Sequence, residues 1–348
     1  MNRIKHMERL EACADTLLGS GSAKNLIVRV GKWDRVLYDL FRSAEERTLS
    51  ENTLFDMASV TKIVVTTTLA LIAIDRGLLS DSDPVSKFFP VPEDKRELTV
   101  RHLLTHTMGY GHKSLLPHTD GYGSVERYVL SIPIDVPIGS DVRYSCPGFI
   151  LLGRILEAVY GMRLDEAFVT LVADPLGLDS SRFLPEKGLD FVNSCRSPER
   201  LGTVNDYNCY HLGGVAGNAG LFSSLSDLSR YVGWMLAKGA PIVSEETFGR
   251  ATRNYTAGMS ASRGLGFLYV DDRYKQTGGL FPEGSIGHCG HTGQSVFVDP
   301  KSGLYVIILS DATVSTVKKY GKEHYEEVME MRRALHAAIR EDLSGSEA

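Results

Sequence analysis

Apolar residues change their spacing along the first eighty residues, and each change predicts a different element. Residues 7–18 place apolar side chains at helical intervals, which predicts an amphipathic helix. Residues 25–41 form two β-branched runs around a Gly-Lys-Trp-Asp turn, the pattern of a β-hairpin. An uncharged apolar run directly follows Lys62, so we expect a buried helix that begins at Ser59 and ends near Gly77, a residue suited to a helix C-cap.

The middle of the chain has a different pattern. Short helical stretches such as "TVRHLLTH" and "GFILLGRILEAVYG" alternate there with loops rich in proline and glycine. This alternation predicts a mainly helical insert over residues 81–214. A glycine-rich loop then leads into a helix whose first residues, Ser224 and Asp227, have the spacing of a capping box.

Strand patterns return in the last third of the chain. The segments "GLGFLYVD" and "SIGHCGHTGQSVFVDPKSGLYVIILSD" predict strands, the last two joined by a turn at Pro300–Gly303, and a helix over residues 316–341 follows. We therefore expect an α/β fold of the α+β type. Its body would be built from both chain ends, residues 1–80 and 215–348, with the helical insert as a subdomain between them.

Charge and composition narrow the classes of partner. The 348 residues carry a formal net charge of -5, which leaves no basic surplus for binding nucleic acid or an anionic membrane. We find no run of about 18 uncharged apolar residues, the length that a membrane span needs. Neither class is therefore expected as a partner, and the sequence gives no sign of the oligomeric state.

The cysteines and the N-terminal segment bear on location. The five cysteines are an odd number without a spacing pattern, which favours free thiols in a reducing compartment over a disulfide framework. The segment "MNRIKHMERLEACADTLLGSGSA" has no apolar core of a signal peptide. We therefore expect a cytoplasmic protein.

Ser59 and Lys62 form the first candidate for chemistry. Residues three apart lie on one helix face, and a serine at a helix N-terminus has free backbone N–H groups nearby. Burial and the helix dipole both disfavour a protonated lysine, so we expect a lowered pKa for Lys62 and a neutral amine that takes a proton from Ser59. The alternative is a purely structural pair, because serine is a common N-cap, lysine is a common first-turn residue, and Ser-x-x-Lys occurs by chance in most proteins.

Five sequence blocks resemble those of a known enzyme superfamily. They are "MASVTK", "LLTHTMG", "RYSCPGFILLGRILE", "GGVAGNAGLFSSLSDLSRY" and "GHCGHTGQSVFVDP", and they run in order over roughly residues 25–312. They resemble the serine β-lactamase-like superfamily, in the branch of class C β-lactamases, D-alanyl-D-alanine peptidases and related esterases. The resemblance implies an antiparallel sheet flanked by helices plus an all-helical subdomain, with the catalytic site between them.

The second block implies a role for Tyr144. By resemblance, its hydroxyl shares proton transfer with Lys62, and a phenol near an ammonium group has a lowered pKa. Cys146 stands where the family has asparagine or aspartate, and a thiol cannot replace an amide or carboxylate in gripping a substrate amide. Tight recognition of a penicillin type is therefore not expected.

The third block of the family, Lys-Thr-Gly or His-Thr-Gly, fits this sequence in two registers. His291-Thr292-Gly293 matches the letters, whereas His288-Cys289-Gly290 matches the spacing to Asp299-Pro300 and is favoured for that reason. In the favoured register His288 faces the site and Gly290 lets the substrate approach the strand. The backbone N–H groups of His291 and Ser59 then form the oxyanion hole.

Metal and phosphate sites are weaker interpretations of two other motifs. The side chains of "HCGH" alternate along a strand and cannot converge on one ion. His102 and His106 have a zinc-compatible i, i+4 spacing but lack the glutamate of the zinc-protease pattern, so we assign them a structural role. The loop "GGVAGNAGLF" lacks the ending of a P-loop; within it Asn218 is a candidate for substrate contact. We expect no metal and no cofactor.

Two functions remain open. The first is a metal-independent serine hydrolase that cleaves an ester, amide or D-amino-acid peptide through an acyl-enzyme, with Ser59 as nucleophile and with Lys62 and Tyr144 moving protons. The second is a ligand-binding or penicillin-sensing protein of the same fold that does not turn over. Cys146 and Cys289 favour the second function, whereas the intact Ser59, Lys62 and Tyr144 favour the first.

Overall fold

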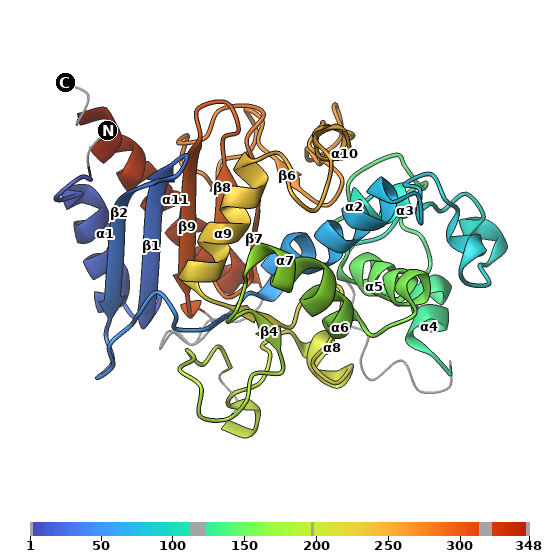
Figure 1. Ribbon diagram of the computed structural model, residues 1–348, viewed down its shortest axis with the longest axis horizontal. Helices are drawn as coiled ribbons and strands as arrows, with labels where there is room; N and C mark the ends of the chain where they lie inside the picture. Colours follow the sequence, from blue (N-terminus) through green and yellow to red (C-terminus); the bar gives the residue numbers. More distant parts are fainter. Residues whose placement is uncertain (1–2, 112–122, 196–197, 313–321, 346–348) are drawn as a thin grey trace.

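A six-stranded antiparallel sheet forms one half of the molecule (Figure 1). The computed structural model describes residues 3–111, 123–195, 198–312 and 322–345. The sheet has the strand order β2-β1-β9-β8-β7-β6. The strands are β1 (Asn25–Lys32), β2 (Arg35–Ser43), β6 (Leu268–Tyr269), β7 (Ile286–Cys289), β8 (Ser295–Val298) and β9 (Leu304–Ser310). Both chain ends thus contribute to one sheet, and the hairpin predicted over residues 25–41 is confirmed as β1 and β2.

Helices cover both faces of this sheet, because successive side chains of a strand point to opposite faces. Leu26, Val28 and Val30 of β1 pack toward α1 (Glu8–Gly19) and α11 (Lys322–Gly345). Ile27 belongs to the core on the other side, where α9 (Leu225–Leu236) lies against β8 and β9. The helix predicted over residues 7–18 is confirmed as α1. The helix predicted over 316–341 is confirmed from residue 322 onward, and residues 316–321 lie outside the described residues.

The other half is mainly helical and contains a small sheet. Its longer helices are α2 (Thr68–Asp75), α4 (Val125–Ser131), α5 (Cys146–Tyr160) and α10 (Glu245–Ala251). Its shorter helices are α3 (Val100–Leu104), α6 (Leu164–Phe168), α7 (Asp174–Leu176) and α8 (Tyr207–His211). Single turns are η3 (Val85–Lys87), η4 (Glu93–Lys95), η5 (Val169–Ala173) and η6 (Pro198–Arg200). The small sheet has the order β3-β5-β4, with β3 (Phe55–Asp56), β5 (Leu221–Ser223) and β4 (Arg182–Phe183).

Two helices cross the boundaries that the sequence suggests for the insert. In Figure 1, α2 and α10 lie beside the helices of the insert, and α10 packs on α2. One comes from residues 1–80 and the other from residues 215–348. Both helices therefore pack with the helical half although they lie outside residues 81–214. The division into a body and an insert 81–214 stays a prediction.

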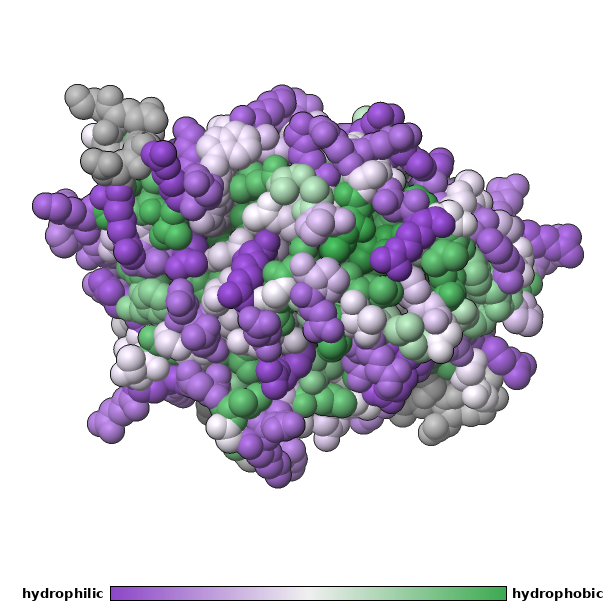
Figure 2. Space-filling model, viewed as in Figure 1, coloured by the Kyte–Doolittle hydropathy of each residue, from purple (hydrophilic) through white to green (hydrophobic). Residues whose placement is uncertain are grey.

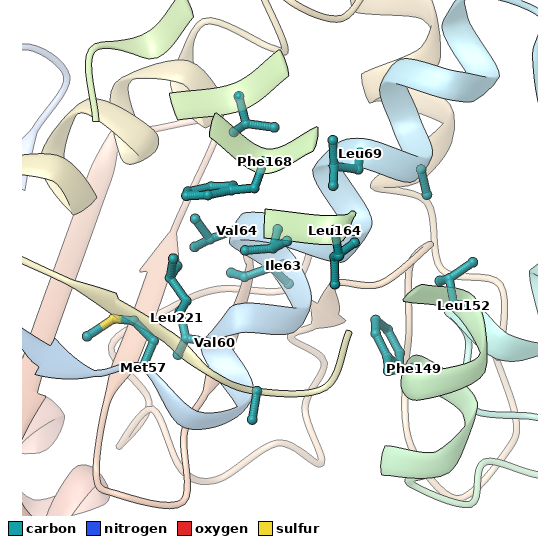
Figure 3. Packing of buried hydrophobic residues seen from close by; sticks show 14 of the residues in the cluster. Met57, Val60, Ile63, Val64, Leu69, Phe149, Leu152, Leu164, Phe168 and Leu221 are labelled. Atoms are coloured by element: carbon teal, nitrogen blue, oxygen red, sulfur yellow. The ribbon is translucent and has the colours of Figure 1, made fainter. Parts of the chain in front are cut away.

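The helical segment that follows Ser59 is the centre of the larger hydrophobic core. It begins as a 3-10 turn, η1 (Ala58–Val60), continues as a π-type segment, η2 (Lys62–Thr67), and becomes α-helical only in α2. Figure 3 shows Val60, Ile63 and Val64 among apolar side chains of α5, α6 and β5. The predicted buried helix is confirmed in place, but its first turns are not α-helical.

Residues Ala58–Asp75 are also long and apolar enough for a membrane span, with 83% of the stretch buried inside the protein. This stretch contains Lys62 and Asp75, so it does not contradict the prediction that no uncharged apolar run reaches this length. Packing against the core accounts for the apolar character of this stretch. On the face shown in Figure 2, hydrophilic residues outline the molecule and apolar residues show between them.

All five cysteines are free, which confirms the prediction of free thiols. Cys146, Cys195 and Cys209 are buried, and Cys13 and Cys289 are partly exposed.

Candidate active site

A strained turn carries the candidate nucleophile. β3 leads into η1, and Ala58 has a φ of 44°, a left-handed conformation that is uncommon for any residue other than glycine. The Asp56 carboxylate holds this turn: Oδ1 accepts from the Ala58 N–H (2.8 Å), and Oδ2 accepts from the Asn205 N–H (2.6 Å) and the Ser194 hydroxyl (3.0 Å). Burial raises the pKa of Asp56, and these three donors lower it. We call the Asp56 carboxylate and its three donors the Asp56 clamp. Ser59 directly follows the turn that this clamp holds, and it is half-buried.

Lys62 lies beneath Ser59 and is completely buried. Its Nζ is 3.0 Å from Ser59 Oγ, 2.9 Å from the Asn218 carbonyl oxygen and 3.5 Å from Cys146 Sγ. Within the described part of the chain it forms no ion pair with a carboxylate. A carbonyl oxygen only accepts, so one N–H of Lys62 is directed at Asn218, and the other two contacts of Nζ are with Ser59 Oγ and Cys146 Sγ.

The protonation expected for Lys62 needs a correction. Burial lowers the pKa of Lys62, but the Cys146 thiol and the Tyr144 phenol in their anionic forms, together with a hydrogen bond to the phenol, raise it, and the net direction is upward. The sequence-based expectation of a lowered pKa considered burial and the helix dipole alone. The ammonium form is stabilised here by acceptors that the sequence pattern does not reveal.

Tyr144 completes the group from the other side. It lies two residues before α5, and its ring centroid is 5.2 Å from Lys62 Nζ. Burial raises the pKa of Tyr144, whereas the Lys62 charge and hydrogen bonds with Ser59 and Lys62 lower it. The net direction is upward, so the lowered pKa expected for this phenol was wrong: burial outweighs the ammonium group. The structure nevertheless brings Ser59, Lys62 and Tyr144 into one hydrogen-bonded group.

Cys146 is the first residue of α5 and is 4% exposed. Its contact with Lys62 places it beside the proton-transfer group rather than at the surface. The helix start is well defined, because the Ser145 hydroxyl accepts from the Gly148 N–H (3.1 Å).

His106 supports Tyr144 in a way that the sequence analysis missed. It has a φ of 58°, and its Nδ1 accepts a hydrogen bond from the Ser145 N–H (3.0 Å). Its ring centroid is 4.5 Å from that of Tyr144. Burial holds the pKa of His106 well below its usual range, so the ring is neutral and carries its proton on Nε2. His102 faces elsewhere, since its Nδ1 accepts from the Thr99 N–H (3.1 Å).

The end of β7 meets the nucleophile turn. His288 is buried with its ring centroid 6.2 Å from that of Tyr144, and its Nδ1–H donates to the Cys289 carbonyl (2.8 Å). Burial holds the pKa of His288 well below its usual range. A Cβ added to Gly290 would lie 2.7 Å from the Met57 carbonyl oxygen, so this strand and the turn before Ser59 are in close contact.

The two registers of the third motif differ in their surroundings. His291 is exposed, whereas Thr292 is buried and donates from Oγ1 to the Asp56 carbonyl oxygen (3.0 Å). Gly293 has a φ of 105° and turns the chain toward β8. His288 therefore lies on the side of Tyr144, and both the register His288-Cys289-Gly290 and the oxyanion role of the His291 N–H stay predictions.

Asn218 has a different position from the one expected for a substrate contact. It is completely buried, its carbonyl binds Lys62, and its Nδ2 donates to Asp206 Oδ1 (3.1 Å). Its placement therefore fits support of Lys62 better than contact with a substrate.

A cavity in the described part of the chain lies apart from this group. It has a volume of about 790 Å³, and Leu184, Phe191, Leu201, Tyr210 and Phe222 are among its lining residues. Ser59, Lys62 and Tyr144 do not line it.

Comparisons with known proteins agree with this fold. A profile of the Beta-lactamase family matches residues 10–328. A Salmonella typhimurium protein named as a D-alanyl-D-alanine carboxypeptidase is 27% identical over 309 aligned positions, which cover 76% of this chain and 71% of the relative.

Two solved structures share the fold at low sequence identity. The octameric penicillin-binding protein homologue from Pyrococcus abyssi has a TM-score of 0.71 at 22% identity and covers 88% of this chain and 73% of its own. EstCE1, described as a hydrolase with promiscuous acyltransferase activity, has a TM-score of 0.72 at 21% identity and covers 94% of this chain and 98% of its own.

Proposed function

Because the chain belongs to the beta-lactamase family, we propose that it is a serine hydrolase that cleaves an ester or amide through an acyl-enzyme. The observation that carries this proposal is the contact of 3.0 Å between Lys62 Nζ and Ser59 Oγ in a buried group shared with Tyr144. A serine hydroxyl is a weak nucleophile unless an adjacent group takes its proton. Here an amine and a phenol are both within reach.

The proposed reaction has two halves. Ser59 Oγ bonds to the carbonyl carbon while its proton passes to the Lys62–Tyr144 pair, and the carbonyl electrons move to the oxygen. The N–H groups of Ser59 and His291 would hold that oxyanion. The electrons return, the bond to the leaving group breaks, and the proton from the pair goes to the leaving group. Water then attacks the acyl carbon while one of its protons passes to the pair, the bond from that carbon to Ser59 Oγ breaks, Oγ takes the proton back, and the acid product leaves.

The substrate class is proposed from two relatives. The name of the Salmonella protein favours a peptide ending in D-alanine, and the name of EstCE1 favours an ester. Cys146 in place of an amide or carboxylate weakens the argument for a substrate amide gripped at that position. We therefore propose small esters and D-amino-acid peptides as the first substrates to assay, and the cytoplasmic location stays a prediction from the sequence.

The test uses a short-chain p-nitrophenyl ester with the wild type and Ser59→Ala. Hydrolysis that disappears in the variant, together with an acyl adduct on Ser59 by intact mass, is the expected result. A stable adduct without turnover would favour the second candidate, a ligand-binding or penicillin-sensing protein. Turnover that persists in Ser59→Ala would overturn the proposal.

A further inference from the structure

A second buried cation lies over the phenol of Tyr144. Arg263, in the loop before β6, has its Cζ 5.6 Å from the centroid of the Tyr144 ring, and Lys62 Nζ is 5.2 Å from the same centroid. Its backbone is fixed on both sides: its N–H donates to Thr256 Oγ1 (2.9 Å), and its carbonyl accepts from the Tyr255 N–H (2.8 Å). The phenol thus has two cationic side chains within cation–π range.

The guanidinium of Arg263 is buried without the partners that usually accompany such a charge. The residue is 9% exposed, and its Nε and Nη1 have no hydrogen-bond partner. Within the described residues Arg263 forms no ion pair with a carboxylate. Burial of an unpaired charge is costly, so a guanidinium whose Nε and Nη1 have no partner and which lies over a phenol points to an electrostatic role.

The other groups around the phenol do not supply a fixed positive charge. Burial and the charges of Arg263 and Lys62 hold the pKa of His106 and of His288 well below the usual range, so both rings are neutral. Cys146 is a potential anion, and Ser59 is neutral. Lys62 changes its charge whenever it accepts or releases a proton.

The groups that Arg263 faces among the described residues are neutral or can become anionic. They are Tyr144, Tyr274, Cys289 and Tyr325, together with the neutral rings of His106 and His288. Burial lowers the pKa of Arg263, but a guanidinium keeps its proton in the working range of proteins. It is therefore the one constant charge of the two that lie over the phenol.

We propose that Arg263 is a positioning residue that stabilises the phenolate form of Tyr144 while Lys62 exchanges its proton. The idea rests on the proposed function, because the phenolate matters for catalysis only if Tyr144 moves protons. In the acylation step the phenolate oxygen accepts the proton of Ser59 as Oγ bonds to the carbonyl carbon. The resulting phenol then gives that proton to the leaving group as its bond to carbon breaks, which regenerates the phenolate beside Arg263.

The first experiment measures acylation by p-nitrophenyl acetate as a function of pH in the wild type, Arg263→Gln and Arg263→Lys. The neutral glutamine removes a charge that favours the phenolate, so the pKa of Tyr144 rises further. We expect the rate near neutral pH to fall roughly tenfold for each unit by which that pKa rises. The loss should shrink at alkaline pH, and Arg263→Lys should retain most of the rate.

Arg29→Gln is the matched control for the loss of a buried arginine. Arg29 is 8% exposed and pairs with Asp39 (2.7 Å) in the sheet, away from the phenol. This variant should lower the melting temperature without moving the pH profile. An equal loss at every pH in Arg263→Gln, with no rescue by lysine, would overturn the proposal in favour of a structural role. A rise in KM confined to carboxylate-bearing substrates would overturn it in favour of binding a substrate anion.

A second measurement tests the proposal without a substrate. The ultraviolet absorbance of tyrosinate is titrated in the wild type and in Tyr144→Phe, and the difference gives the ionisation of Tyr144. Arg263→Gln should shift that difference titration to higher pH, and an unchanged midpoint would contradict the proposal. If the wild type does not hydrolyse esters, or if Ser59→Ala retains the activity, the proposed function fails while this titration still reports on Arg263.

Discussion

Buried charge is arranged differently on the two sides of Ser59. On one side the Asp56 carboxylate accepts hydrogen bonds from Ala58, Asn205 and Ser194. On the other side Lys62 and Arg263 lie over Tyr144, and within the described residues neither is paired with a carboxylate. A charge surrounded by donors fixes the backbone around it, whereas charges without a counter-ion act on whichever nearby group can become anionic. The first arrangement shapes the turn, and the second acts on the proton-transfer group.

The largest effect is expected from Lys62→Met, which removes the amine and leaves the turn in place. Acylation of Ser59 should fall by roughly 10²–10⁴-fold, the usual contribution of an acid–base group. The measurement is single-turnover acylation followed by intact mass. Lys95→Met is the matched control, because Lys95 is 1% exposed and its Nζ contacts Asp94 (3.1 Å), outside the site. Wild-type acylation in Lys62→Met would remove the amine from the mechanism.

Asp56→Asn tests the clamp. The amide presents a donor where the carboxylate accepts from Asn205 and Ser194, so the free energy of unfolding should fall by about 1–3 kcal/mol, the cost of leaving buried donors unsatisfied. Acylation should slow as well, because the side chain that holds the Ala58 N–H is itself no longer held by Asn205 and Ser194. Denaturant unfolding and the ester assay measure the two effects.

Asp227→Asn provides the control for that clamp. Asp227 is equally buried and accepts from the Ser180 N–H (2.9 Å), the Ser181 N–H (2.6 Å) and the Ser181 hydroxyl (2.7 Å). We expect it to lose stability without a change in acylation by the remaining folded protein. Equal loss of acylation in Asp56→Asn and Asp227→Asn would mean that the hydrogen bonds of Asp56 contribute only to folding.

Gly290→Ala tests the contact between β7 and the turn. The added Cβ would lie 2.7 Å from the Met57 carbonyl oxygen, which is backbone and cannot move aside cheaply. We expect a loss of about 1–3 kcal/mol in the free energy of unfolding, as for overpacking elsewhere. Gly249→Ala, in α10 with open space around the added Cβ, should be neutral or stabilising. Thermal melts of the two variants make the comparison, and equal melting temperatures would contradict the contact.

His106→Asn and His106→Phe separate two contacts with the Tyr144 segment. Asparagine keeps an acceptor for the Ser145 N–H and tolerates the left-handed backbone, whereas phenylalanine keeps only the ring. The asparagine variant should therefore retain more acylation, with a difference of up to about tenfold, equivalent to one buried hydrogen bond of about 1.4 kcal/mol. The pH profile of acylation provides the measurement. A better phenylalanine variant would show that the ring contact dominates.

The sequence predicted much of the fold and the members of the central group. The β-branched runs gave the first hairpin, and the Ser-x-x-Lys and tyrosine blocks identified three side chains that the structure brings together. The spacing to Asp299-Pro300 favoured the register that starts at His288, the histidine that lies beside Tyr144. These features are local in the chain or are carried by short motifs.

What the sequence could not supply depends on groups brought together from distant segments. The pKa directions of Lys62 and Tyr144 were wrong because they follow from the depth of burial and from Cys146, and for Lys62 also from Tyr144. Arg263 follows no motif and is 119 positions after Tyr144 in the numbering. The block "LLTHTMG" drew attention to His106. It did not reveal the hydrogen bond through which His106 holds the Ser145 N–H next to Tyr144.

The π-type segment Lys62–Thr67 limits how this chain could be shortened. A π turn holds an extra residue compared with an α turn, so deleting one residue there would give a regular helix with better backbone hydrogen bonds. Each residue of an α-helix advances the chain by about 100°. The deletion would therefore rotate Lys62 relative to Thr66, whose hydroxyl is bonded to the Gly217 carbonyl (2.7 Å). A more regular helix and a correctly aimed amine are mutually exclusive at this position.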